Sequence, residues 1–231
     1  MSEKNTIVNC ESCTVRWKGF KHLTKSEFQL INDNRYEATF KPGEIIIKQD
    51  SPASNALFLA SGMAKSYIEG IKDRNFIMSV LMPGILIMGP GAYVTLRYTY
   101  SVAALTAVQA CFIDFEILRQ LVKVNSGFAE SLLEDISEKS LRSHIRMVNL
   151  AQKKMPGRLA EALLYFSGEV FKADEFEMIL SRQELGEMTN MVKESVVRIL
   201  KELEELGVIS IHSSMVKITN KEKLLKISEK G

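Results

Sequence analysis

The sequence lacks the features that mark membrane and secreted proteins. No apolar run approaches the roughly 18 residues of a membrane-spanning helix. The first ten residues, MSEKNTIVNC, lack the apolar core of a signal peptide. The three cysteines, an odd number, do not make a disulfide framework. These absences predict a cytoplasmic protein that does not enter a membrane.

Motifs of enzyme active sites are missing as well. The sequence contains no glycine-rich phosphate loop, no zinc-hydrolase pair and no nucleophile elbow. A single Cys-x-x-Cys pattern, Cys10 to Cys13, could serve a redox enzyme. Such a pattern normally sits at a helix start beside a βαβ unit, and neither is predicted here. The chain is therefore expected not to be an enzyme, and a Cys-x-x-Cys redox enzyme is a remote alternative.

Charge of one sign is also scarce. The 231 residues include 30 Lys and Arg against 28 Asp and Glu, so the formal net charge is only +2. This balance gives no argument for nucleic acid binding, and any attraction to phosphate must come from local patches. The hydrophobic share of 46% and the charged share of 25% are typical of a globular protein. The length suffices for two modest domains.

The most informative segment runs from residue 180 to residue 211. Ser181 can cap a helix, and Glu184, three residues on, completes a capping box. Asn190 tolerates the left-handed backbone that a tight turn needs. A second helix is predicted over residues 192–206. The segment therefore predicts two short helices joined by a turn.

The predicted second helix has two different faces. One face is apolar, with hydrophobic residues at three- and four-residue steps: Val196, Ile199, Leu200, Leu203 and Leu206. The other carries the candidate DNA-reading residues Lys193, Glu194, Val197, Arg198 and Lys201. Arg reaches both acceptors of guanine, Glu can accept from cytosine, and a small apolar residue can touch a thymine methyl. Mixtures of Lys and Glu also cover many solvent-exposed helices, so this face alone leaves both interpretations open.

The residues after this helix favour DNA binding. Gly207 ends the helix, and the runs 208–211 and 215–219 flank a polar turn, which predicts a hairpin. A hairpin after a recognition helix is the wing of a winged helix-turn-helix. The stretch RQELGEMTNMVKESVVRILKELEELGVI closely resembles the DNA-binding segment of the Crp–Fnr family. That family includes the cyclic-AMP receptor protein and the oxygen-sensing fumarate-nitrate reduction regulator.

The resemblance implies roles for individual residues. By position, Glu194 and Arg198 would read bases, and Lys193 would often join in. Val197 occupies a position that helps to set operator sequence in the family. Val192 stands where a capping Ser is common, so the helix start lacks a side-chain cap. Ser181 and Arg182, at the start of the first helix, complete the predicted DNA-contacting set.

Residues 35–125 are predicted to form a β-rich domain. Short apolar runs at even spacing alternate with Pro and Gly turns, a pattern typical of a barrel or a double-sheet jelly roll. The segments FKPGEIIIKQ, ALFLASGMAKSYI and MPGILIMGPGAY resemble the effector domain of the same family. The resemblance implies a jelly roll of the cyclic-nucleotide-binding type.

The residues disfavour cyclic AMP as the effector. A nucleotide pocket of this type needs an Arg for the phosphate and a Glu for the ribose, and residues 87–101 contain no Glu. Met88 stands roughly where the Glu would be, and Tyr98 and Thr99 stand near the Arg and Ser. Arg97 is one residue away from the required place. A pocket for another effector is predicted around Met88, Gly89, Arg97, Tyr98 and Thr99.

The three cysteines are candidate metal ligands. Two thiols three residues apart can hold a metal or act as a redox pair. The oxygen-sensing branch of the family holds a [4Fe–4S] cluster, and Cys10, Cys13 and Cys111 match three of its four ligand positions by resemblance. Gly19 stands at the fourth position and has no ligating side chain. The open alternatives are an iron–sulfur cluster with another fourth ligand, zinc with His22, a thiol switch, and no cofactor. In the last case Cys111 would be a buried strand residue and Cys10 and Cys13 would lie in a solvent-exposed arm.

The rest of the chain completes the predicted organisation. Residues 1–34 would form an arm and a helix. Within residues 126–154, one long helix is predicted from Phe128 to about Gln152, after a break at Asn125-Ser126-Gly127, and its apolar stripes suit a helix–helix seam. In the family this is the dimerisation helix. Residues 155–231 would form the winged helix-turn-helix, including an amphipathic helix over residues 158–171 and a strand over residues 176–180. Lys153, Lys154 and Arg158 lie close to where family members contact the DNA backbone.

The predicted fold class is thus α+β: a β jelly roll, a dimerisation helix and a winged helix-turn-helix. The expected function is that of a homodimeric transcription regulator, which binds double-stranded DNA at a palindromic operator. Contact with RNA polymerase is implied by the resemblance. The alternative is a sensor of a small molecule or metal in the β domain, without an iron–sulfur cluster.

Overall fold

The computed structural model describes residues 10–13, 15–71 and 74–231. The first nine residues of the predicted arm lie outside these ranges. The chain divides into two compact units. The first joins Met1–Ser66 to Leu81–Lys139, and the second joins Tyr67–Val80 to Ser140–Gly231.

The first unit opens with two 3₁₀ turns and a helix. η1 (Cys10–Ser12) and η2 (Lys18–His22) precede α1 (Lys25–Asp33). Thr24 caps α1, because its hydroxyl accepts from the Glu27 amide at 3.3 Å and the Glu27 carboxylate accepts from the Thr24 amide at 2.7 Å. The helix predicted after the arm is confirmed.

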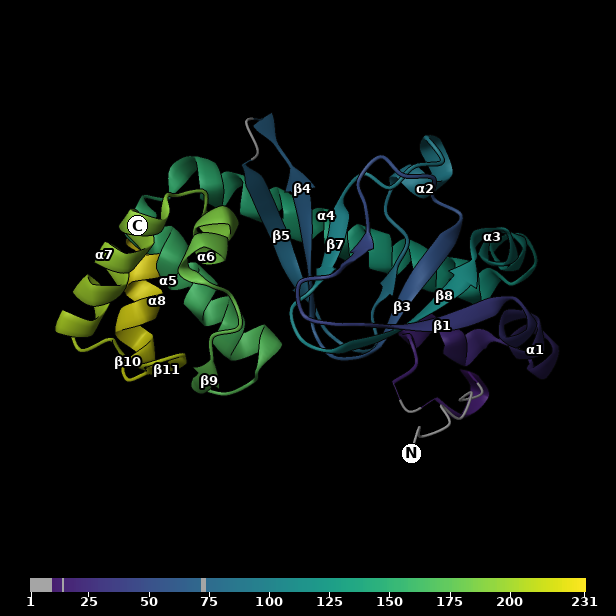
Figure 1. The fold of residues 1–231 in the computed structure, drawn as a ribbon, viewed down its shortest axis with the longest axis horizontal. Coiled ribbons are helices and arrows are strands. Elements are labelled where there is room, and N and C mark those ends of the chain that lie inside the picture. The colour runs from purple at the N-terminus through teal and green to yellow at the C-terminus, as the bar shows by residue number, and fades with distance from the viewer. Residues whose placement is uncertain (1–9, 14, 72–73) are drawn as a thin grey trace. The chain divides into compact units, whose positions relative to one another are not determined.

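Two four-stranded sheets follow, with the orders β1-β8-β3-β6 and β2-β7-β4-β5. Their strands are β1 (Arg35–Phe40), β2 (Ile45–Ile47), β3 (Asn55–Ser61), β4 (Ala64–Glu69), β5 (Asn75–Leu81), β6 (Leu86–Ile87), β7 (Ser101–Ala104) and β8 (Val108–Asp114). A short helix, α2 (Gly91–Val94), lies between β6 and β7. Figure 1 shows β1, β8 and β3 side by side. The predicted β domain is confirmed, although β6 and α2 were not predicted.

Packing explains the apolar runs of the sequence. In β3 the four consecutive residues from Ala56 to Leu59 are all buried. Because side chains alternate between the faces of a strand, both faces of β3 must be covered. The first unit has a continuous hydrophobic core, which also takes in Leu118 and Leu121 of α3 (Phe115–Val124) and Phe128.

Helix α4 (Ser126–Gln152) begins two residues earlier than predicted. Asn125-Ser126-Gly127 was expected to separate two helices, but the Asn125 side chain accepts from the Phe128 amide at 3.0 Å and caps a helix that begins at the next residue. Gly127 fits because a Cβ there would lie 2.7 Å from Nδ1 of His22. No helix in the described ranges is both long and apolar enough to cross a membrane.

The C-terminal part of the second unit contains the predicted winged helix-turn-helix (Figure 1). Its elements are α5 (Met155–Tyr165), the π-helical turn η4 (Phe166–Val170), β9 (Glu175–Glu177), α6 (Arg182–Thr189), α7 (Lys193–Glu205), β10 (Ile209–His212), β11 (Met215–Ile218) and α8 (Lys221–Lys230). The three strands form one sheet in the order β10-β11-β9.

Three elements in this part differ from the prediction. The helix expected over residues 158–171 begins at Met155, because Pro156 suits its first turn, and it changes to π geometry after Tyr165. The strand expected over residues 176–180 is only β9, since β11 offers pairing partners to residues 175–177 alone. Helix α8 was not predicted, although the Asn220 side chain caps it by accepting from the Lys223 amide at 2.9 Å.

Candidate DNA-reading helix and cysteine-lined cavity

The turn between α6 and α7 is built by local interactions. Ser181 and Glu184 form both bonds of a capping box, at 3.2 Å and 2.8 Å, as predicted. Asn190 adopts the predicted left-handed conformation, with φ 53° and ψ 56°. A Cβ on Gly186 would lie 2.5 Å from the carbonyl oxygen of Met191, so the turn closes against a glycine. Gly186 was not among the predicted residues, although a glycine inside a helical pattern is a signal of close packing.

Helix α7 separates an apolar face from a charged one. Val196, Ile199, Leu200 and Leu203 are buried. Leu206 was predicted to join them, but it lies after the last helical residue and is 53% exposed. The five candidate DNA-reading residues are all exposed: Lys193, Glu194, Val197, Arg198 and Lys201. Val192 precedes the helix without a side-chain cap, as expected.

Two ion pairs lie along the exposed side of α7. Nη1 of Arg198 lies 2.6 Å from Oε1 of Glu202, and Nζ of Lys201 lies 3.8 Å from Oε1 of Glu205. Glu202 was absent from the predicted site, although its spacing of four residues from Arg198 is the sequence signal for such a pair. The Arg198 side chain is 56% exposed, so the pair is open to solvent on one side.

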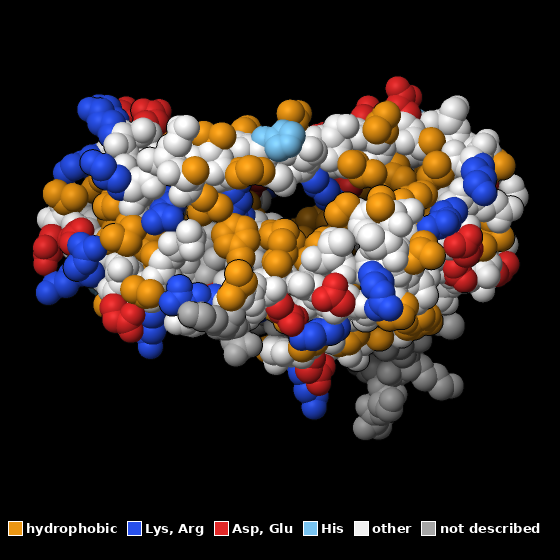
Figure 2. All heavy atoms as spheres, turned by 90° about the horizontal axis from the view of Figure 1, so that it is seen from above, with side chains coloured by type: hydrophobic (Ala, Val, Ile, Leu, Met, Phe, Trp, Pro, Cys, Tyr) orange, Lys and Arg blue, Asp and Glu red, His pale blue; other side chains and the backbone are white. Residues whose placement is uncertain are grey.

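The remaining predicted DNA contacts differ in how far their side chains are exposed to solvent. Ser181 is exposed, whereas Arg182 is half-buried, and burial lowers its pKa while the charge of Glu204 opposes that shift. The Lys153 ammonium lies 3.1 Å from the Glu161 carboxylate and 3.2 Å from the Ser228 hydroxyl, and its side chain is mostly buried. Lys154 is exposed, so it is the better candidate for a phosphate contact. Figure 2 shows Lys and Arg mixed with Asp and Glu on the face it presents, in line with the small net charge.

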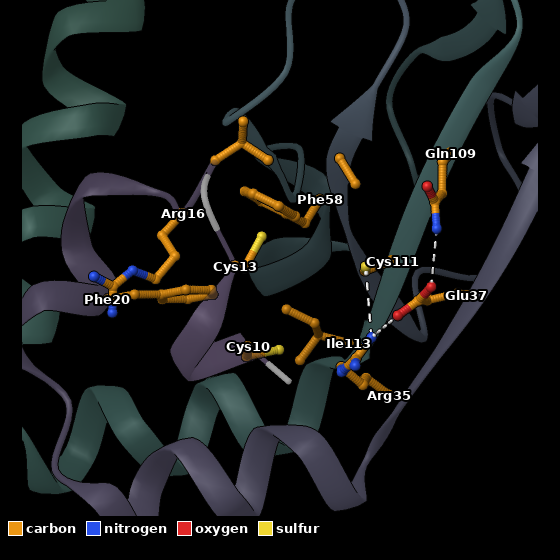
Figure 3. A pocket seen from close by; sticks show the side chains of 12 residues that line it. Cys10, Cys13, Arg16, Phe20, Arg35, Glu37, Phe58, Gln109, Cys111 and Ile113 are labelled. Atoms are coloured by element: carbon orange, nitrogen blue, oxygen red, sulfur yellow. Dashed lines mark hydrogen bonds and ion pairs between the residues drawn. The ribbon is translucent and has the colours of Figure 1, made fainter. Parts of the chain in front are cut away.

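The three cysteines lie around one cavity of about 310 Å³ (Figure 3). Cys10 and Cys13 come from the arm, and Cys111 comes from β8, about a hundred residues further on. Cys10 is buried and the other two are partly buried, so the alternative of a solvent-exposed arm is wrong. The fold thus brings together the three thiols that the sequence singled out.

A charged network forms one wall of this cavity. Nη1 of Arg35 donates to Oε1 of Glu37 at 2.5 Å and to Sγ of Cys111 at 3.6 Å (Figure 3). The amide of Gln109 donates to the other Glu37 oxygen at 3.0 Å. The Arg35 side chain is only 3% exposed. The register places Glu37 opposite Cys111 on the neighbouring strand, which brings the network to the thiol.

Burial controls the protonation of the thiols. It raises the pKa of Cys111 to about 11, with the charge of Glu37 adding to the rise and that of Arg35 opposing it. Burial also raises the pKa of Cys10, and Arg35 again opposes the shift. Both thiols are therefore held in the protonated form near neutral pH, and metal binding would have to displace their protons.

The side chains around the cavity do not form a site for a single metal ion. In the described part of the chain, no group of three or more His, Cys, Asp or Glu side chains is placed to hold one metal ion. His22 is exposed and lies against Gly127, not in the cavity, so the zinc alternative with His22 is wrong. A Cβ on Gly19 would lie 1.9 Å from the Trp17 ring, so no side chain fits there. The three thiols that line the cavity would be the ligands of an iron–sulfur cluster, one fewer than the four that such clusters take.

Several residues predicted to form an effector pocket, in the segment after β6, are buried or make contacts within the protein instead. Met88 and Tyr98 are buried, and the Tyr98 hydroxyl donates to the Asn55 carbonyl at 2.5 Å. The Arg97 guanidinium donates to the carbonyl of Asp50, while Arg97 and Thr99 are exposed. Gly89 has a φ of 70° and lies beside the Tyr100 ring. These contacts favour a structural role for Arg97 and Tyr98, which anchor the loop before β3.

Helix α4 exposes the apolar residues predicted to form a dimer seam. Five of them are between 50% and 66% exposed: Leu133, Ile136, Leu141, Ile145 and Val148. A set of large aliphatic side chains left in water along one helix is typical of a surface that meets a partner.

Comparison with known proteins agrees with this geometry. Residues 37–125 match the family described as cyclic nucleotide-binding domain, and residues 157–227 match the Crp-like helix-turn-helix domain. An anaerobic regulatory protein from Aggregatibacter actinomycetemcomitans is 23% identical over 228 residues, covering 96% of this chain and 88% of that protein. The cAMP-activated global transcriptional regulator CRP of Salmonella typhimurium is 26% identical over 175 residues, covering 74% and 83%.

The fold has solved counterparts. FixK2 from Bradyrhizobium japonicum is similar with a TM-score of 0.76 at 19% identity, covering 84% of this chain and 96% of that one. At this identity the likeness concerns the fold. With both domain families matched in the same order along the chain, the protein belongs to the Crp–Fnr family of DNA-binding transcription regulators, with a cyclic-nucleotide-binding-type sensory domain.

Proposed function

We propose that the protein acts as a homodimer that reads a palindromic operator and responds to a redox signal at the cysteine-lined cavity. The observation that carries the proposal is the exposed face of α7. It combines a guanidinium, a carboxylate and a small apolar side chain within two helical turns, at Arg198, Glu194 and Val197. These are the groups that distinguish base pairs in the major groove. As a regulator of transcription, the dimer would act together with RNA polymerase.

Dimerisation would occur through α4. Its exposed aliphatic side chains would be covered by the same helix of a second copy, as an isologous interface requires. A two-fold axis would place two copies of α7 about one turn of DNA apart, which is the geometry a palindromic site demands. The dimer and the operator symmetry therefore belong to one proposal.

The signal would enter at Cys10, Cys13 and Cys111. Thiolates are the ligands that iron–sulfur clusters take, and a bound cluster would supply one-electron redox chemistry. Arg35 would donate to Sγ of Cys111, as it does in the structure. Hydrogen bonds to the sulfurs are among the features that set cluster potentials. Arg35 and Glu37 would thus hold the Cys111 side of the site.

Contacts between the arm and α4 support a route from this cavity to the dimer seam. The ring of Trp17, four residues after Cys13, packs edge-on against Phe128 in the first turn of α4, with centroids 5.5 Å apart. Nζ of Lys18 lies 3.1 Å from Oε1 of Glu138 on the same helix. A change at the cavity that moves the arm would therefore disturb α4.

The proposal is tested by an absorption spectrum of protein purified without oxygen, together with its iron and sulfide content. A visible band that bleaches in air and is lost in Cys13→Ser and Cys111→Ser would support the cluster. Colourless, iron-free protein from anaerobic cells would overturn the cluster and favour a small-molecule or thiol signal in the β domain. DNA binding is tested separately, by retarded migration of a duplex selected from a random pool.

A further inference from the structure

We propose that Glu202 is a positioning residue for base reading, because its carboxylate holds the Arg198 guanidinium in the orientation that meets guanine. This inference rests on the proposed role of Arg198 as a base reader. It adds a residue of α7 that does not itself reach a base. It also accounts for an acidic residue on the charged side of a helix that must approach a polyanion.

Arg198 and Glu202 form a hydrogen-bonded ion pair. Arg198 and Glu202 are one helical turn apart, and Nη1 lies 2.6 Å from Oε1. The Glu202 side chain is 45% exposed, and it emerges beside the buried Leu203 at the edge of the charged face. The carboxylate therefore lies C-terminal to Arg198 along α7. Residues near the N-terminal half of a recognition helix contact the bases. Glu202 would therefore hold the guanidinium from the C-terminal side, away from the bases.

Arg198 has enough N–H donors to bind Glu202 and guanine at the same time. A guanidinium has five N–H donors in a rigid plane. The bond to Glu202 uses Nη1, so the edge formed by Nε and Nη2 remains for the O6 and N7 acceptors of guanine. A side chain already fixed in this plane loses less conformational freedom when it binds. The pair would thus favour the correct base pair without contacting it.

If Glu202 has no positioning role, electrostatics predicts that removing its carboxylate strengthens DNA binding. A negative charge on α7 repels DNA phosphates, so its removal should tighten binding to every sequence alike. Positioning instead predicts that its removal lowers the preference for guanine at one position. These two effects differ in whether they depend on sequence, and they can be measured separately.

Glu205 provides a matched control on the same helix. It pairs with Lys201 at 3.8 Å, and both side chains are well exposed, at 77% for Lys201 and 66% for Glu205. Glu205→Gln removes the same charge as Glu202→Gln and also breaks an i,i+4 pair. It leaves the Arg198 guanidinium with its partner. Any difference between the two variants therefore reports the contact to Arg198.

The experiment uses the full-length protein and DNA duplexes selected from a random pool by the parent protein. Binding of Glu202→Gln, Glu205→Gln and Arg198→Ala is measured against the selected duplex and a scrambled duplex of equal length and composition. Each variant is also used to select again from the random pool, which shows the base preference at every position. The salt dependence of scrambled-duplex binding reports the purely electrostatic part.

We expect Glu202→Gln to lower the ratio of selected to scrambled affinity by roughly three- to tenfold. The base preference should relax at the position that Arg198→Ala relaxes. Glu205→Gln should tighten both duplexes equally and leave the base preference at the position read by Arg198 unchanged. If the two glutamine variants behave alike, Glu202 has no positioning role. If Arg198→Ala itself leaves base preference unchanged, the proposed function of Arg198 is wrong, and the positioning role falls with it.

Discussion

The thiol of Cys111 allows a quantitative test of the cavity in cofactor-free protein. Burial raises its pKa to about 11, whereas an ordinary cysteine has a pKa of about 8.5. Only the thiolate is alkylated. Near neutral pH the thiolate fraction, and with it the alkylation rate, should therefore be about two to three orders of magnitude below that of the unfolded chain.

The assay is alkylation by iodoacetamide without oxygen, followed by mass spectrometry of the Cys111 peptide at a series of pH values. The logarithm of the rate should keep rising with pH well beyond the ordinary thiol pKa, toward about 11. Urea-unfolded protein provides the reference. A rate that levels off near the ordinary pKa would show that burial only blocks the reagent. A rate equal to that of the unfolded chain would show that the arm does not close over the thiol.

The same shift predicts how stability depends on pH. The folded state holds the Cys111 proton more tightly than the unfolded state does, because its pKa is raised on folding. This contribution to stability is complete below the ordinary thiol pKa of about 8.5 and is lost as pH rises toward about 11. Urea unfolding of the cofactor-free protein across this range should show stability falling. Cys111→Ser should show a smaller fall.

Further predictions concern the DNA-binding part and α4. Ser181→Ala should lower stability by about 1 kcal/mol in urea unfolding, because it removes the cap of α6, and an unchanged midpoint would contradict this. Gly186→Ala should impair folding of the turn and DNA binding together, since its Cβ would lie 2.5 Å from the Met191 carbonyl oxygen; full operator affinity would show that the turn tolerates a side chain. Ile145→Glu should yield monomers in sedimentation without loss of helix content, because the side chain is 63% exposed within one chain; a persistent dimer would exclude the α4 seam. Arg198→Ala should weaken binding to the selected duplex by about 1–3 kcal/mol, and equal weakening on scrambled DNA would assign it to phosphate contact instead.

Much of the reading motif could be predicted because its determinants are local. The capping box of Ser181 and Glu184, the left-handed Asn190 and the positive φ of Gly207, 66°, all depend on neighbours within a few residues. The predicted recognition helix was correct to within one residue at each end. The Arg198–Glu202 pair also lay within reach, since a spacing of four residues on a helix brings side chains together.

Elements without a strong local pattern were harder to predict. Helix α8 buries only Leu224 and Ser228, so its sequence carries little apolar periodicity. It packs on α5, where a Cβ on Gly157 would lie 2.5 Å from the Cα of Gly231. The partners of Lys153 could not be predicted for a similar reason. Its partners Glu161 and Ser228 lie on other helices, and the sequence does not show that they are close.

The sequence by itself determined the order of the domains, the reading helix and which cysteines to examine. Only the tertiary structure decided that Cys10 and Cys13 line the same cavity as Cys111, because that placement depends on the fold of the arm and on β8. It also decided that Arg35 and Glu37 lie beside these thiols, through the register of β1 on β8. Interactions within one helical turn are encoded by residue spacing, whereas contacts across a hundred residues depend on how the whole core packs.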